Sequence, residues 1–79
     1  FELTSTNDWG GGFCADGLVR NESDEAVTWR VTADADGTIA DIWNAQVETD
    51  GGTWIFVGDP WNATLEPGEE ASFGFCANR

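Results

Sequence analysis

Apolar and polar residues alternate in several short runs of this chain, and no run repeats its apolar residues at the spacing of a helix. The clearest run is residues 26–33, in which every second residue from Val27 to Ala33 is apolar and the residues between them are polar. Such alternation places the two kinds of side chain on opposite faces of a β-strand. Similar patterns predict strands at four further ranges: 1–6, 13–20, 53–57 and 71–76. Because residues 53–57 are apolar on both faces, we expect that strand to lie centrally in the core.

Turn-forming residues separate these runs. Gly, Asp, Asn and Pro gather at six places: residues 10–12, 21–25, 34–37, 50–52, 59–60 and 67–68. Short strands at this spacing are typical of two antiparallel sheets packed face to face. The sequence therefore predicts an all-β fold, an antiparallel β-sandwich of the immunoglobulin-like or jelly-roll type. We expect one small domain spanning residues 1–79, without linker or repeat.

The charge of the chain excludes several functions. Its 79 residues include 15 Asp or Glu against 3 Arg, with no Lys and no His, which gives a net charge of −12. Without a basic patch the domain cannot neutralise nucleic acid or dock on anionic lipid. The lack of histidine and lysine also argues against catalysis, a metal site or a cofactor. The repulsion among these charges is screened in concentrated salt, so we expect a halophilic source; a cationic partner is the alternative explanation.

Two cysteines offer a covalent link in a chain whose core is small. Cys14 and Cys76 lie 62 positions apart, and closing such a loop contributes about 4 kcal/mol in the chain-entropy model. Neither a Cys-x-x-Cys pair nor a neighbouring histidine suggests a metal or redox site. We therefore expect a Cys14–Cys76 disulfide in a secreted, extracellular protein, with two buried free thiols in a cytosolic protein as the alternative.

The five tryptophans divide into two kinds by their neighbours. Trp29 continues the apolar face of residues 26–33 and Trp54 lies inside an apolar run, so both are predicted to be core residues. Trp9, Trp43 and Trp61 have polar neighbours and are predicted to lie near solvent, although a single tryptophan in so small a domain is more often core. Exposed indoles are costly unless a ligand covers them. A row of flat aromatic rings on a sandwich suits the apolar C–H faces of pyranose rings.

The same residues carry a resemblance to a known family. In chain order, the motifs are Asn7-Asp8-Trp9-Gly10-x-Gly12-Phe13, Trp29-x-Val31, Ile42-Trp43-Asn44-Ala45, Trp61-Asn62-x-Thr64-Leu65-x-Pro67-Gly68 and Phe73-Gly74-Phe75. This ordered set, which covers nearly the whole chain, resembles the family 2 carbohydrate-binding modules. The first motif also looks like the chitin-binding modules of archaeal chitinases, which leaves the choice between cellulose and chitin open. Taken with the charge, the resemblance leads us to expect a halophilic archaeal or bacterial source. Family members are non-catalytic β-sandwiches attached to secreted cellulases, chitinases and xylanases.

The resemblance implies a binding site. The three surface tryptophans of the cellulose- and chitin-binding branch fall on Trp9, Trp43 and Trp61. The family's core tryptophan falls on Trp29. The polar helpers of the family fall on three further positions: Asn7, Asp41 and Asn62. The resemblance thus predicts a monomer that binds insoluble β-1,4-linked polysaccharide, either chitin or crystalline cellulose, and directs a covalently linked hydrolase to it.

Two rival functions compete with this prediction. The first is a structural or protein-interaction sandwich of a cell-surface protein, in which the tryptophans would form the partner interface. The second is an enzyme, which would need two carboxylates set apart by their environments. No pair is marked out, and neighbouring acidic residues such as Glu69 and Glu70 point to opposite faces of a strand. A calcium loop at Asp34–Gly37 lacks its first ligand and its final bidentate glutamate, so we interpret that segment as a turn.

Overall fold

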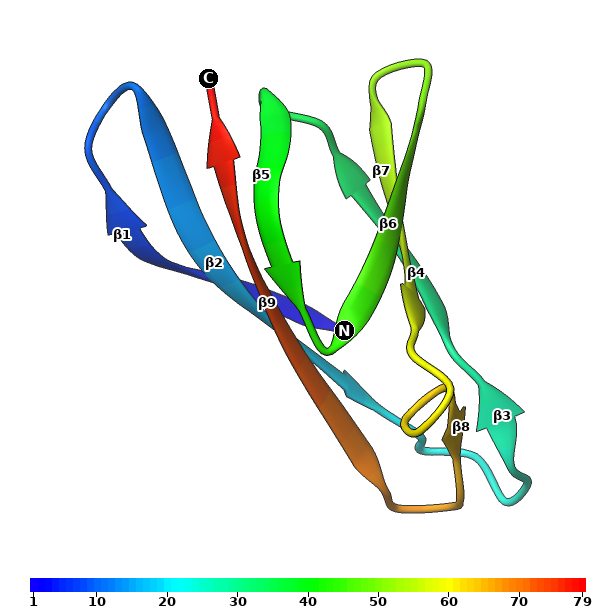
Figure 1. Cartoon of the computed structure of the whole chain (residues 1–79). Coiled ribbons are helices and arrows are strands. Elements are labelled where there is room, and N and C mark those ends of the chain that lie inside the picture. The colour runs from blue at the N-terminus through cyan, green and yellow to red at the C-terminus, as the bar shows by residue number, and fades with distance from the viewer.

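The computed structural model describes all residues, 1–79, and consists of strands joined by turns. One sheet has the strand order β1-β2-β9-β5 and faces a second sheet of order β4-β7-β6, while a short pair, β3-β8, closes one end (Figure 1). The bounds are β1 Glu2–Asp8, β2 Gly12–Arg20, β3 Val27–Thr28, β4 Arg30–Asp34, β5 Thr38–Trp43, β6 Ala45–Asp50, β7 Thr53–Gly58, β8 Thr64–Leu65 and β9 Glu70–Asn78. All pairs of neighbouring strands are antiparallel. The predicted all-β sandwich is confirmed.

The core lies between the two larger sheets and is rich in aromatic rings. From the four-stranded sheet, Phe73 and Phe75 point inward, as the alternation in residues 71–76 predicts. From the three-stranded sheet, Trp54 and Phe56 meet them, with ring centroids 5.3 Å apart for Trp54 and Phe75 and 4.9 Å apart for Phe56 and Phe73. Each such ring removes a large apolar area from water. These rings supply much of the burial on which so small a fold depends.

The predicted strand over residues 26–33 is wrong in one respect, because the chain divides there into β3 and β4. Trp29 separates them: its backbone N–H donates to the carbonyl of Ala63 at 3.0 Å, across to the segment that precedes β8. Its side chain is buried, as predicted, whereas Val27 on the same predicted face is exposed. Alternation marks which side chains share a face, but it does not show that one partner strand serves the whole run.

Three further differences concern strand positions and exposure. Strands β5 and β6 were not predicted. In β5, a bulge between Ile39 and Asp41 spaces the apolar residues three apart and breaks the two-residue period. Strand β6 has only two apolar residues, Ala45 and Val47, in its alternating pattern. Strand β1 is an outermost strand of its sheet and is exposed along its whole length. Strand β7 is the middle strand of its sheet, yet only one of its faces is fully buried.

Two absences can be stated of the molecule. None of its elements is a helix of the length and apolar character needed to cross a membrane. No group of three or more Asp, Glu or Cys side chains is arranged to hold a metal ion.

Candidate functional site

The Trp9 and Trp43 rings lie on the same face of the four-stranded sheet, the outer face, which is turned away from the core. Each ring lies over a glycine: a Cβ added to Gly12 would collide with the Trp9 ring, and one added to Gly74 would collide with the Trp43 ring. Gly12 and Gly74 occupy strands β2 and β9, two residues before Cys14 and Cys76 respectively. Because alternate residues of a strand share a face and the two cysteines pair across the sheet, both glycines present the same side.

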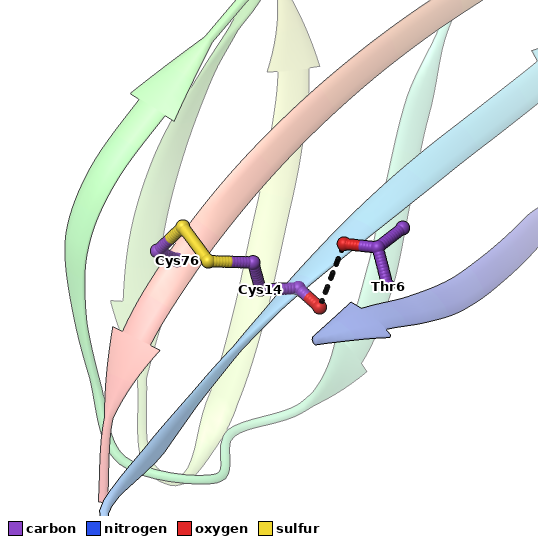
Figure 2. The surroundings of a disulfide bond; sticks show 3 residues. All are labelled: Thr6, Cys14 and Cys76. Atoms are coloured by element: carbon purple, nitrogen blue, oxygen red, sulfur yellow. Dashed lines mark hydrogen bonds between the residues drawn. A yellow bond between two sulfur atoms is a disulfide. The ribbon is translucent and has the colours of Figure 1, made fainter. Parts of the chain in front are cut away.

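The Cys14–Cys76 disulfide lies between the two rings. The cysteines are directly opposite each other in β2 and β9, with their Cα atoms 4.0 Å apart, and the bridge between the two strands is visible in Figure 2. Along the strands, the pair that includes Gly12 and the pair that includes Gly74 are four residues apart, which corresponds to roughly 13 Å. The predicted disulfide is confirmed, and it ties together the two strands on which the rings rest.

A row of paired residues crosses the sheet at the disulfide. Asn7 of β1 pairs with Cys14, and Asp41 of β5 pairs with Cys76. Both side chains are exposed. The structure therefore places two of the three predicted polar helpers in one line across the sheet, between the rows of Trp9 and Trp43.

Trp61 lies on the loop between β7 and β8, next to the end of β5. The loop is held by Asn62: its side-chain amide donates to the carbonyl of Asn44 at 2.8 Å, and its own carbonyl accepts from the Trp29 indole N–H at 2.7 Å. Asn44 has a left-handed backbone, φ 62°, and forms the single-residue link between Trp43 and β6. Trp61 is thus anchored beside the strand end that carries Trp43.

These bonds change the expected part played by Asn62. Its amide nitrogen is already engaged with Asn44, and its side-chain oxygen is buried without a partner. Trp29 likewise does more than fill the core, since its indole N–H fixes the loop of Trp61. Sequence reasoning missed both positioning roles, because they depend on residues 18 and 33 positions apart in the chain.

An ion-pair cluster supports the turn that carries Trp9, and it was also missed. The Arg79 guanidinium donates to Asp8 at 2.8 Å and to Asp36 at 2.9 Å, and it lies 4.7 Å from the centroid of the Phe13 ring. The Asp8 carboxylate also accepts the backbone N–H of Gly10 at 2.9 Å. The hydrogen bond from Arg79, followed by the one from Gly10, lowers the pKa of Asp8 below its ordinary value. Asp8 is therefore committed to holding the turn.

Exposure separates the tryptophans as the sequence predicts. The exposed fractions are 54% for Trp9, 45% for Trp43 and 73% for Trp61, against 4% for Trp29 and 1% for Trp54. Three indoles are in contact with water, two of them over glycines of one sheet face and the third beside that sheet's end. Together they make a surface suited to a flat apolar ligand face.

Comparison with known protein families gives a match to the model described as "Cellulose binding domain", over residues 1–79. The chain belongs to this family. It is 38% identical to endoglucanase E-5 of Thermobifida fusca over 79 residues, which is 96% of this chain and 17% of that protein. It is also 38% identical to chitinase C of Streptomyces lividans over 76 residues, 92% of this chain and 12% of that protein.

A solved structure agrees with the family assignment. The chitin-binding domain of Chi18aC from Streptomyces coelicolor superposes with a TM-score of 0.79 at 32% identity, covering 98% of this chain and 76% of that one. The cellulose-binding-domain family is one of binding modules, so the predicted polysaccharide-binding, non-catalytic character of the chain is confirmed. The chain spans less than a fifth of the length of each of these two curated relatives.

Proposed function

We propose that residues 1–79 act as one module that binds insoluble β-1,4-linked polysaccharide, chitin or crystalline cellulose, through a tryptophan strip made of Trp9, Trp43 and Trp61. The observation that supports it is the seating of two exposed indoles on glycines of one sheet face, with the third anchored beside them. Exposed indoles on one side of the molecule can stack against the apolar face of a polymer. The adjoining row supplies Asn7 and Asp41 as hydrogen-bonding partners for sugar hydroxyls.

The energetics require the three rings to act together. If each ring covers about 60 Å² of itself and as much of a sugar, one stack contributes about 3 kcal/mol before losses. Three stacks then contribute about 9 kcal/mol, from which association and ordering costs are subtracted. A micromolar dissociation constant needs about 8 kcal/mol net, so the hydrogen bonds of Asn7 and Asp41 and the many adjacent sites of a solid polymer would make up the difference.

We further propose that the module is exported as a monomer and is covalently linked to a hydrolase that it directs to the solid. An endoglucanase and a chitinase each contain a related segment as a small part of their length. The disulfide is typical of proteins that fold outside the cytosol. Asn62, whose amide bonds within the molecule, would act by fixing the loop of Trp61.

The test is a depletion experiment on washed crystalline cellulose and on washed chitin. Wild type should sediment with one or both solids and release no reducing sugar. The variant in which all three strip tryptophans are alanine should stay in solution while keeping its circular dichroism spectrum. If wild type also stays in solution on both solids, the proposal is refuted and a protein-interaction domain of a cell surface takes its place.

A further inference from the structure

A cavity opens on the outer face beside Trp43. It has a volume of about 370 Å³ and lies between β1 and the end of β5, so that Glu2 and Asn44, far apart in sequence, line the same space. The N-terminus lies beside the β5–β6 turn in the ribbon as well (Figure 1). A sugar stacked on the Trp43 ring would therefore have this cavity at its edge.

The walls of the cavity mix three kinds of group. Carboxylates come from Glu2 and Asp16, hydroxyls from Thr4 and Ser72, and an apolar wall from Leu18, which is 37% exposed. The register of the sheet brings them together, because Glu2 pairs with Leu18, Leu18 with Ser72, and Thr4 with Asp16. None of these side chains makes an ion pair or side-chain hydrogen bond within the molecule. The cavity thus offers acceptors, donors and an apolar surface that are all free.

This combination suits one substituent of β-1,4 polysaccharides. The sugars of cellulose and chitin differ at C2, which carries a hydroxyl in cellulose and an acetamido group in chitin. An acetamido group has an N–H for a carboxylate, a carbonyl for a hydroxyl donor and a methyl for an apolar wall. A hydroxyl can use only the polar part of the lining, and hydrogen bonds to a charged acceptor are among the stronger ones.

We propose that this cavity receives the acetamido group of the sugar stacked on Trp43, with Asp16 as acceptor of its N–H, and so makes the module prefer chitin to cellulose. The proposal rests on the function proposed above, since it needs a sugar on Trp43. It adds residues outside the tryptophan strip that distinguish chitin from cellulose by the substituent at C2.

The experiment compares depletion isotherms on three solids: chitin, the same chitin after chemical deacetylation, and crystalline cellulose. Wild type should bind chitin about tenfold more tightly than either of the others. Asp16→Ala should lower affinity for chitin about fivefold to tenfold and leave affinity for cellulose unchanged. The matched control is Glu48→Ala, which removes one carboxylate from β6 of the other sheet and should behave as wild type. Melting temperatures check each fold, and Ser72→Ala gives a second, milder test within the cavity.

The outcomes separate this inference from the function beneath it. Equal wild-type affinity for chitin and cellulose, or an unchanged preference in both cavity variants, overturns the acetamido site while leaving the tryptophan strip intact. Tightest binding to the deacetylated solid also overturns the acetamido site, because the carboxylates would then be binding the positively charged amino groups of that solid. Loss of wild-type binding to every solid refutes the proposed function itself.

Discussion

Replacing Trp61 with alanine should separate binding from stability more cleanly than any other change in the strip. At 73% exposure, Trp61 presents about 180 Å² of a side chain whose full area is about 250 Å². A sugar that covers one face would bury roughly 60 Å² of the ring and an equal area of its own, so the stack contributes about 3 kcal/mol. Losing it should weaken adsorption by up to about a hundredfold on the polysaccharide that wild type binds.

The same substitution should have little effect on the stability of the fold. The hydrogen bonds that fix the loop come from Asn62 and from Trp29, whereas the Trp61 indole takes part in none of them. We therefore expect the melting temperature of Trp61→Ala to stay within a few degrees of wild type. Trp43 is a poorer choice, because more than half of it is covered and its ring packs on Gly74.

Depletion isotherms on chitin and cellulose give the affinity, and thermal unfolding followed by circular dichroism gives the stability. Trp61→Phe is the matched control, since a smaller ring keeps part of the stacking area and should recover part of the affinity. Adsorption of Trp61→Ala equal to wild type would show that the ring does not touch the polymer. A large fall in melting temperature would instead show that the ring supports the fold.

Three other perturbations follow from contacts in the structure, together with one from the charge. Trp29→Ala should lower the free energy of unfolding by about 3–5 kcal/mol, measured by urea titration, because it opens a cavity and releases the loop of the third ring. Gly74→Ala should displace the Trp43 ring and weaken adsorption about tenfold, while the circular dichroism spectrum remains that of the folded protein. Unchanged adsorption would contradict the packing of the Trp43 ring on Gly74. The pKa of Asp8 is lower in the folded state than in the unfolded state, where it is about 3.9. The bond to Arg79 therefore stabilises the fold above that pH, and this stabilisation is lost as the pH falls through the folded-state pKa. The melting temperature of Asp8→Asn should lie below that of wild type at neutral pH and converge with it at lower pH. Raising salt from about 0.01 M to 1 M shortens the screening length from about 30 Å to 3 Å, so the melting temperature should rise by several degrees in a molecule of charge −12, and a fall would refute the repulsion argument.

Much of the architecture could be predicted because local chemistry decides it. Alternation marks the inward residues of β9, and the polar neighbours of Trp9, Trp43 and Trp61 indicate rings in contact with water. The cysteine pair predicts its own bridge. Each of these depends on a residue's immediate surroundings in the chain, which a single sequence contains.

The remainder depends on which strands pair and in what register. The bulge in β5 hides that strand from any two-residue pattern. Arg79 reaches Asp8 across 71 positions, and no local signal connects them. Asn21-Glu22-Ser23 fits the Asn-x-Ser pattern of an N-glycosylation site. The side-chain amide of Asn21 is nevertheless buried and donates to two carbonyls, those of Glu25 and Leu65. Long-range pairing creates the contacts of Arg79 with Asp8 and of Asn21 with Leu65.

The glycines beneath the indoles have a consequence for engineering. Copying the three tryptophans onto another sandwich would displace the rings that correspond to Trp9 and Trp43, because a side chain at the position of Gly12 or Gly74 would occupy the space that the ring takes here. The design of such a site on another sandwich would first need glycines at these two positions and then the aromatic residues that pack on them.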